Sequence, residues 1–87
     1  MANSKSAEKR WRQSLKRRDR NRSRRSAARS AIREVRELVA AGESEATAAA
    51  LSAAYSSLDR AAKTGAIHVG KADRTKRRLA ALVQNAR

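Results

Sequence analysis

Eight arginines and lysines crowd the fifteen residues KRRDRNRSRRSAARS, residues 16–30, beside a single acid, Asp19. Apart from alanine this segment holds no apolar residue, so it cannot supply a hydrophobic core. The chemistry open to such residues is the binding of phosphate. The planar guanidinium group of arginine donates paired hydrogen bonds to phosphate oxygens and also stacks on flat rings. The composition therefore indicates a surface that binds a polyanion.

Charge is divided unevenly along the 87 residues, which carry a net charge of +14. Residues 1–33 have thirteen basic and two acidic side chains, a net charge of +11, whereas residues 34–62 have two basic and five acidic ones, a net charge of −3. Residues 63–87 have seven basic and one acidic, a net charge of +6. Repulsion between these charges opposes compaction, and a bound polyanion would relieve it. Nucleic acid is the leading candidate, followed by an anionic membrane surface.

Catalytic chemistry is hard to place on this chain. There is no cysteine, and the one histidine, His68, has no second histidine with which to hold a metal. The eight acids are scattered, and no glycine-rich phosphate loop is present. We therefore expect no enzyme, no cofactor, no metal site and no small-molecule substrate. His68 is expected to make a loop hydrogen bond, either to backbone or to a phosphate.

The elements that must position the basic residues are helices. Proline is absent, glycine occurs only at positions 42, 65 and 70, and strong helix formers dominate the composition. The glycines divide the chain into predicted helices over about residues 6–41, 44–63 and 71–85. Gly42 is expected to end the first helix in the left-handed conformation, and Thr64-Gly65 to end the second. Ser44 is predicted as the N-cap of the second helix.

Each predicted helix carries an apolar stripe with the i, i+3, i+4, i+7 spacing of a packed face. The stripes are Ala28, Ala31, Ile32, Val35, Leu38 and Val39; then Ala48, Leu51, Ala54, Tyr55, Leu58, Ala61 and Ala62; then Ala72, Leu79, Leu82, Val83 and Ala86. Ile67 and Val69, in the connection over residues 66–70, are expected to tuck under the bundle. The pattern predicts an all-α fold, a three-helix antiparallel bundle whose long, basic first helix projects beyond the bundle.

We expect one domain over residues 1–87, with residues 26–87 forming the bundle and residues 1–25 a basic RNA-binding extension of the first helix. The apolar stripe starts only near Ala28, so some twenty residues, roughly 30 Å of helix, have nothing to pack against. An isolated helix of this length is marginal in water, and strong positive charge makes it less stable. Residues 1–25 are therefore predicted to be frayed or disordered when the protein is alone.

A projection at 100° per residue spreads the cations of this extension around the whole helix. A membrane-surface helix needs an apolar face, so no membrane partner is expected, and a helix that reads a DNA major groove needs one contact face. A helix that is basic on every side suits being surrounded by phosphates, as between two RNA helices. A solvated, flexible tail is the plainer alternative. The interleaved helix formers and the Ser and Asn side chains, which can donate to phosphates, argue against it.

A second basic cluster begins the third helix, with Lys63 nearby across the loop. Lys71, Arg74 and Arg78 share one face of this helix, although ordinary surface charge would give the same pattern. Trp11 is either a platform on which a base stacks or a packing residue. From the residues alone RNA is favoured over DNA, and a nucleoid or regulatory DNA-binding protein stays open as the alternative.

Three blocks of the sequence, ANSKSAEKR, NRSRRSAARSAI and AAKTGAIHVGKADRTKRRLA, resemble the bacterial small-subunit ribosomal protein S-twenty family in order and spacing. The resemblance implies a three-helix protein that binds 16S ribosomal RNA directly, at the 5′ domain and the long penultimate helix. It also implies an early role in assembly of the small (30S) subunit, contact with other 30S components and a cytoplasmic location on the ribosome.

The positions that match the family's blocks imply a set of RNA contacts. They are Asn3, Lys5, Ser6, Lys9, Arg10, Asn21, Ser23, Arg24, Arg25, Ser26, Arg29, Lys63, His68, Lys71, Arg74 and Lys76. The charge pattern adds Arg17, Arg18, Arg22 and Arg78 to this predicted rRNA-binding set. The chain departs from the family at Gly70, where the family often has Asn, so the third helix is expected to lack a side-chain cap.

Overall fold

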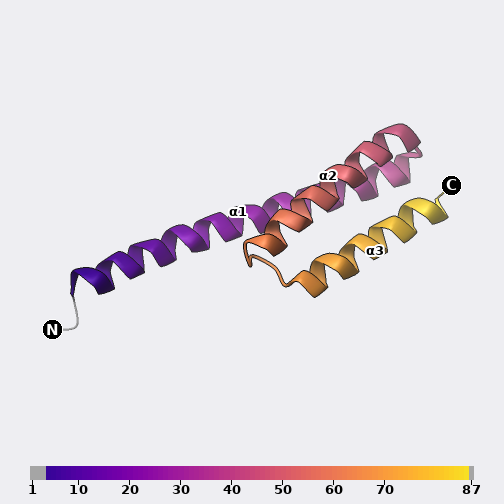
Figure 1. The fold of residues 1–87 in the computed structure, drawn as a ribbon. Coiled ribbons are helices and arrows are strands. Elements are labelled where there is room, and N and C mark those ends of the chain that lie inside the picture. Colours follow the sequence, from indigo (N-terminus) through magenta and orange to yellow (C-terminus); the bar gives the residue numbers. More distant parts are fainter. Residues whose placement is uncertain (1–3, 87) are drawn as a thin grey trace.

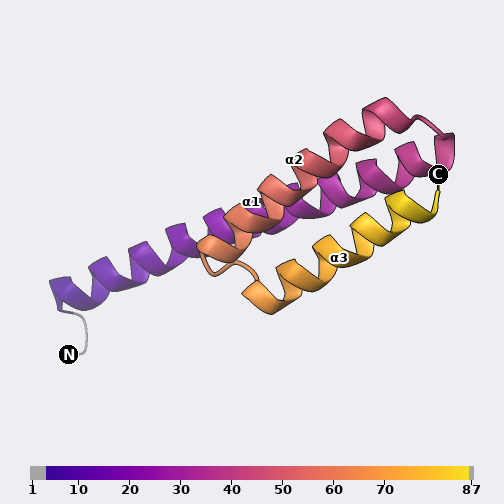
Figure 2. The ribbon, with the colours of Figure 1, turned by 45° about the vertical axis from the view of Figure 1, so that its right-hand side comes forward.

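The computed structural model describes residues 4–86, and nearly all of them lie in three helices: α1 (Lys5–Ala41), α2 (Ser44–Lys63) and α3 (Val69–Asn85) (Figure 1). No strand occurs within residues 4–86. The chain turns back after α1 and again after α2, so neighbouring helices run antiparallel (Figures 1 and 2). The predicted all-α class and the bundle with a projecting first helix are confirmed.

The first helix begins and ends as its terminal residues dictate. The Ser4 hydroxyl accepts a hydrogen bond from the backbone N–H of Ala7 at 3.2 Å, which satisfies one of the free donors of the first turn. At the other end Gly42 has a φ of 75°, in the left-handed region. The backbone N–H groups of Gly42 and Glu43 then donate to Val39 and Leu38, which closes the helix. The prediction for Gly42 is confirmed.

The core lies between the C-terminal half of α1 and the other two helices, and it is built largely from alanine. Its buried members are Ala28, Val35, Ala50, Ala54, Leu58, Ala72 and Leu79. Alanines let helices approach closely but bury little area each, whereas a fully buried leucine contributes about 2 kcal/mol. The two buried leucines, Leu58 and Leu79, therefore account for much of the hydrophobic stabilisation in a small core.

Four residues predicted to pack are exposed instead: Ala48, Val69, Leu82 and Ala86. In α2 the buried face runs through Thr47, Ala50, Ala54, Leu58 and Ala61, so Ala48 lies beside the stripe and not on it. Val69 is 59% exposed because it is the first residue of α3, outside the contact with α2. Ile67 is half-buried against the core, as predicted.

The second helix spans the predicted residues, but Ser44 is its first helical residue and not its N-cap. Ser44 is already helical, and Glu43 stands at the cap position without a side-chain cap hydrogen bond. The Thr47 hydroxyl donates to the Glu43 carbonyl at 2.6 Å, which is a bond within the first turn and not a cap of its N–H groups. That bond lets the threonine be buried at the end of the core, because its hydroxyl has a partner.

The third helix begins at Val69 and not at Lys71, and it does have a side-chain cap. The His68 Nδ1 accepts a hydrogen bond from the backbone N–H of Gly70 at 3.0 Å. The expectation that Gly70 leaves this helix uncapped is therefore wrong. A Cβ atom at position 70 would lie 3.1 Å from the same His68 Nδ1, so glycine makes room for the histidine ring.

The α2–α3 connection is held at both ends. Gly65 has a φ of 80°, and the N–H groups of Gly65 and Ala66 donate to Ala62 and Ala61, which ends α2 as predicted. The Arg25 side chain then reaches over from α1 and donates to the Ala66 carbonyl at 3.1 Å. A residue of the basic segment thus anchors the loop that leads into the second basic cluster.

The N-terminal part of α1 stands clear of the bundle. Residues 4–20 are all exposed, the first half-buried position is Asn21, and the first buried one is Ala28. The molecule is correspondingly elongated, 63 × 20 × 14 Å (Figure 1). None of the helices in the described part of the chain has a stretch long and apolar enough to cross a membrane. The proposed division between an extension over residues 1–25 and a bundle over residues 26–87 stays an expectation.

Candidate nucleic-acid interface

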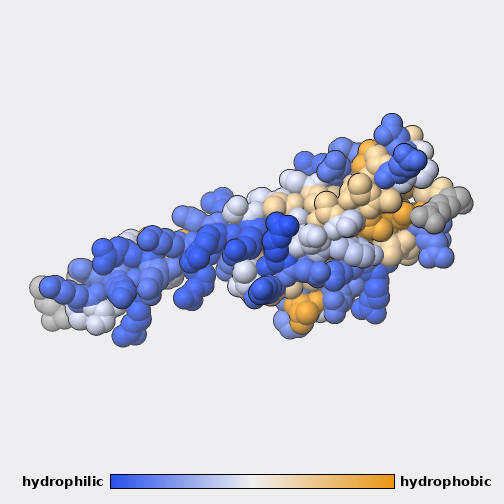
Figure 3. Space-filling model, turned by 45° about the horizontal axis from the view of Figure 1, so that its top comes forward, coloured by the Kyte–Doolittle hydropathy of each residue, from blue (hydrophilic) through white to orange (hydrophobic). Residues whose placement is uncertain are grey.

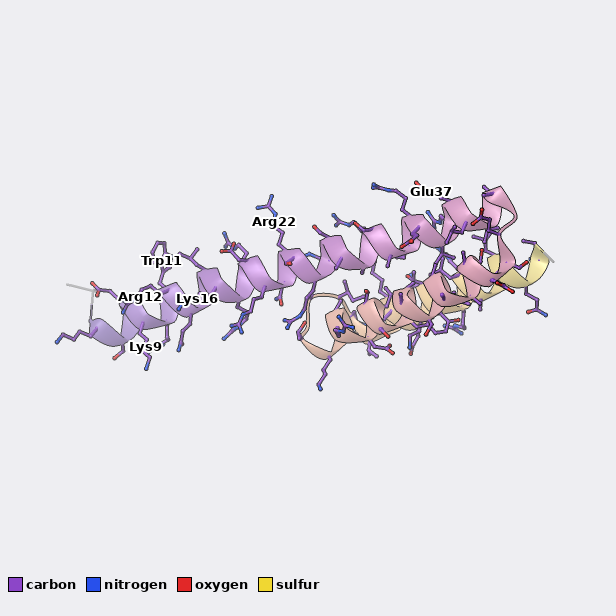
Figure 4. The ribbon with its side chains drawn as sticks, turned by 90° about the horizontal axis from the view of Figure 1, so that it is seen from above. Lys9, Trp11, Arg12, Lys16, Arg22 and Glu37 are labelled. Atoms are coloured by element: carbon purple, nitrogen blue, oxygen red, sulfur yellow. The ribbon has the colours of Figure 1, made fainter. Side chains whose placement is uncertain are left out.

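The projecting part of α1 presents cations in every direction. In Figure 4 Trp11 and Arg22 leave the helix on the side away from α2 and α3, whereas Lys9 and Lys16 leave it on the opposite side. The space-filling view shows hydrophilic residues along the whole extension, with apolar residues gathered on the bundle (Figure 3). Within residues 4–86 the single ion pair joins α2 to α3, so the cations of the extension are not neutralised by the protein's own acids.

Most of the predicted rRNA-binding residues have exposed side chains. The exposed members are Lys5, Ser6, Lys9, Arg10, Arg17, Arg18, Arg22, Ser23, Ser26, Arg29, Lys63, His68, Lys71, Arg74 and Arg78. Asn21, Arg24, Arg25 and Lys76 are half-buried. Asn3 lies outside the described residues. The set is thus divided between the extension and the end of the bundle where the α2–α3 loop lies.

The hydrogen bond from Arg25 to Ala66 brings the two basic clusters together. The bond uses one guanidinium nitrogen of Arg25, and arginine has further N–H donors that can bind an anion. Arg25, Arg29 and Lys71 line one shallow hollow between α1 and α3. Residues that lie more than forty positions apart in the sequence therefore share a surface, which helical periodicity within each segment could not reveal.

His68 makes the backbone hydrogen bond that was one of its two predicted roles. Because Nδ1 accepts from Gly70, the ring proton of the neutral imidazole lies on Nε2. The exposed side chain therefore keeps one N–H donor free of the cap. This arrangement leaves the second predicted role, donation to a phosphate, chemically open.

Lys76 differs from the other cations of the predicted rRNA-binding set because its ammonium group is paired with a carboxylate of the protein. Its ammonium group forms an ion pair with Asp59 of α2 and lies 5.6 Å from the centre of the Tyr55 ring. The hydrogen bond from the lysine to Asp59 is the main reason that the pKa of Lys76 is raised above 10.5. Lys76 joins α2 to α3, and sequence spacing alone did not separate it from its exposed neighbours.

Trp11 does not belong to the core. Its side chain is 66% exposed, and Leu15, one turn later, is 36% exposed. The packing alternative for Trp11 is therefore wrong for the described chain, and base stacking stays a prediction. The two residues form a short apolar strip on an otherwise polar helix.

Arg36 is a further exposed cation of α1, on the same side of the helix as Arg29. The predicted rRNA-binding set did not include it. It lines a hollow of about 240 Å³ with Thr75, Arg78, Leu79 and Leu82 of α3. The signal for it was its position seven residues after Arg29, which places both on one side of α1. Residues 34–62 carry a net negative charge, so the charge pattern did not indicate Arg36.

Across residues 4–86 no group of three histidine, aspartate or glutamate side chains could hold a metal ion.

Glu43 and Glu45 lie at the α1–α2 turn, at the end of the bundle opposite the α2–α3 loop (Figure 1). These two glutamates therefore lie at the end of the molecule away from the cationic extension.

Comparison with known proteins gives one consistent result. A family model described as ribosomal protein S20 matches residues 2–84. The small ribosomal subunit protein bS20 of Colwellia psychrerythraea is 48% identical over 84 residues, covering 97% of this chain and 98% of that protein. The bS20 protein of Thermomicrobium roseum is 51% identical over 79 residues, covering 91% of this chain and 80% of the relative. That of Shewanella woodyi is 52% identical over 79 residues, covering 91% and 90%.

Proposed function

The chain belongs to the family of ribosomal protein S20, and on that premise we propose that it binds 16S ribosomal RNA directly within the small (30S) subunit. Family membership makes it a structural protein of the small ribosomal subunit and not an enzyme, with a cytoplasmic location on the ribosome. The finer proposal is that it joins the 5′ domain of the RNA to the long penultimate helix and does so during assembly.

One observation carries the proposal: the projecting part of α1 is exposed on all sides, and its cations have no ion-pair partner among residues 4–86. A helix that is cationic on all sides is stabilised most where phosphates surround it, as between two RNA helices. Each phosphate that a lysine or arginine neutralises releases condensed counterions, which drives binding at low salt. Serines beside the arginines donate to phosphates and fix the register of the helix.

The bundle contributes a second contact region around the α2–α3 loop. Lys63, His68, Lys71 and Arg74 are exposed there, and the bond from Arg25 to Ala66 holds the loop against α1. We assign Lys76 a structural role instead, because its ion pair with Asp59 already occupies its charge. The protein would thus touch RNA at two places, and the stiff α1 would fix the distance between them.

RNA recognition would depend on shape more than on base sequence. Double-stranded RNA exposes its phosphates and 2′-hydroxyls but hides most base edges from side chains. Arginines that surround a helix suit such a surface, because they contact backbones on several sides at once. This preference for RNA shape separates the proposal from a nucleoid or regulatory DNA-binding protein.

The test is the affinity of the full chain for a 5′-domain fragment of 16S rRNA and for duplex DNA of equal length, measured at matched salt. We expect the RNA to bind at least about tenfold more tightly, a difference of about 1.4 kcal/mol. Equal affinity for both polyanions would contradict the proposal, since it would leave only unspecific charge attraction.

A further inference from the structure

Two hollows follow one another along the line where α3 lies beside α1. The first is lined by Arg25, Arg29 and Ile32 of α1 with Lys71 and Thr75 of α3. The second is lined by Arg36 of α1 with Thr75, Arg78 and Leu82 of α3. Thr75 belongs to both, so they form one groove, here called the α1–α3 groove. The groove exists because α3 packs chiefly on α2 and makes few contacts with α1.

The α1 side of the groove is a row of arginines from which acids are absent. At 100° per residue Arg25, Arg29 and Arg36 fall within about 40° of one another. Glu34 and Glu37 lie about 160° and 100° from Arg36 on the same scale, so their carboxylates point away. From Arg25 to Arg36 the row spans about 16 Å of helix.

The α3 side repeats this arrangement. Lys71, Thr75, Arg78 and Leu82 fall within about 60° of one another, whereas Asp73 lies about 160° from Thr75. The Thr75 hydroxyl donates to the Lys71 carbonyl at 2.8 Å, so the side chain is held against its own helix. Five cations therefore border the groove and no carboxylate lines it: Arg25, Arg29, Arg36, Lys71 and Arg78, here called the groove cations.

The floor of the groove is apolar and partly open. Ile32, Leu58 and Ile67 line the first hollow, and Leu79 and Leu82 the second. Leu82 is 38% exposed, so apolar surface is available between the two rows of cations. A third hollow, at the far end of the bundle near Leu38 and Val83, has the same apolar character. It is lined by Glu43 and by no lysine or arginine, so it does not suit an anion.

The chemistry of the groove selects an anionic polymer with an apolar edge. Cations on both sides of the groove match the phosphates of one nucleic-acid strand, and sugar and base edges can cover the apolar floor. A membrane surface would need a protruding apolar face, whereas here the apolar side chains lie between flanking cations. An acidic protein segment would satisfy the charges as well, but the proposed function already places RNA along α1, which favours RNA as the occupant.

We propose that the α1–α3 groove is an RNA-binding site that holds one strand of the RNA backbone between the groove cations. The inference rests on the proposed function and extends its contact region at the α2–α3 loop along the bundle to Arg36 and Arg78. It also assigns a role to Arg36, which lies outside the residues expected from the sequence. The groove lies between helices that pack in the bundle, so its shape does not depend on residues 5–20.

The decisive variant is R36Q/R78Q in the full chain, which removes one groove cation from each side. Both side chains are exposed, so the fold should be retained, and a thermal unfolding curve checks this. The matched control is R60Q/R77Q, which lowers the net charge equally from exposed positions outside the groove. Affinity for the 5′-domain RNA fragment is then measured over a range of salt concentrations.

We expect R36Q/R78Q to bind about tenfold or more weakly than R60Q/R77Q, because charge-assisted hydrogen bonds are lost and not merely net charge. The salt dependence, d log K/d log [salt], should become less steep by about 1.4 to 1.8 for two phosphates no longer neutralised. If the two variants bind alike, the groove inference is overturned. If even the unaltered chain fails to prefer RNA over DNA, the proposed function itself fails.

A second measurement needs no substitution. Modification of arginine side chains by a dicarbonyl reagent, with and without the RNA fragment, reports which arginines the RNA covers. The inference predicts that Arg36 is protected in the complex, whereas Arg60 and Arg77, exposed outside the groove, stay reactive. Protection of Arg18 and Arg22 in the extension while Arg36 stays fully reactive would overturn the groove site and leave the proposed function standing.

Discussion

At the level of single residues, His68 and Arg25 each use part of their hydrogen-bonding capacity to stabilise the fold. His68 caps α3 through Nδ1, and Arg25 holds the α2–α3 loop through the Ala66 carbonyl. Both belong to the set expected to contact RNA, and both retain N–H donors beyond these bonds. Their substitution should therefore affect stability as well as binding, and the two effects must be measured separately.

The cap gives a prediction about stability. H68A removes the acceptor of the Gly70 N–H and should destabilise the protein by about 1 kcal/mol, the usual cost of a lost N-cap. H68N, which offers a cap acceptor, should recover most of this loss. Urea unfolding at neutral pH measures both, and equal destabilisation by the two variants would contradict the assigned role.

Gly70 supplies the internal control for that prediction. A Cβ atom at this position would stand 3.1 Å from the His68 ring, so G70A should bring little gain in the presence of the histidine. In the H68A background the crowding is gone, and alanine should stabilise the helix by about 0.5–1 kcal/mol over glycine.

Lys76 gives a prediction about pH. Its pKa is raised chiefly by the hydrogen bond to Asp59, with smaller contributions that include the charge of Asp73. A raised pKa means that this stabilisation is fully present below the unfolded lysine value of 10.5 and is lost as the pH rises through the folded pKa. The ion pair therefore stabilises the protein at neutral pH and ceases to do so in strong alkali.

D59N should lower the pKa of Lys76 markedly, and D73N should lower it less, as followed by NMR of the lysine side chain over an alkaline titration. D59N should also weaken the protein at neutral pH, with the difference from the unaltered chain shrinking at high pH. An unchanged lysine pKa in D59N would show that the ion pair does not form in solution.

At the level of helices, periodicity and glycine predict most of what is observed. The ends at Gly42 and Gly65 and the buried stripe of α1 follow from local sequence, because each depends on contacts within one helix turn or on a left-handed residue. The start of α3 lies two residues earlier than predicted, and Ser44 is the first residue of α2 and not its N-cap. His68 caps α3, which its residue type alone does not signal.

What the sequence could not predict is how helices meet. The exposure of Leu82 and the groove beside it depend on how α3 packs beside α1, and the spacing of apolar residues within one helix does not specify this packing. For the same reason Lys76, half-buried against Asp59, could not be separated from the exposed Lys71 by spacing. The RNA contacts therefore stay a prediction, and what the structure adds is how these side chains are arranged.

The exposed part of α1 carries a prediction about folding. Like charges four residues apart, such as Lys5 with Lys9 and Arg18 with Arg22, destabilise a helix that has no packing partner. In the free protein at low salt, residues 5–20 should show little helical character in backbone chemical shifts and fast amide exchange. Added salt screens the repulsion and should raise the helicity, and bound RNA should raise it further. A stable helix over residues 5–20 at low salt would contradict the prediction.

At the level of the whole molecule, positive charge is concentrated in the projecting part of α1, at one end of a 63 Å axis. A polyanionic partner at that end would relieve the repulsion between these charges. The acidic α1–α2 turn lies at one end, and the extension leaves the bundle at the other. Such a molecule would approach a polyanion with its basic end first. RNA that binds only the folded, ordered form also stabilises it by mass action, which suits a protein with a small, alanine-rich core.

The most direct measurement is the salt-dependent affinity for the 5′-domain RNA fragment of two full-length variants, K16Q/R18Q/R22Q in the extension and R33Q/R60Q/R77Q on the bundle. Both lower the net charge by the same amount. If α1 is surrounded by phosphates, the first should reduce the steepness of d log K/d log [salt] by about 2 to 3, and the second should leave it nearly unchanged. Equal effects of the two variants would mean that RNA senses only the total charge, and that the projecting helix has no particular role in holding it.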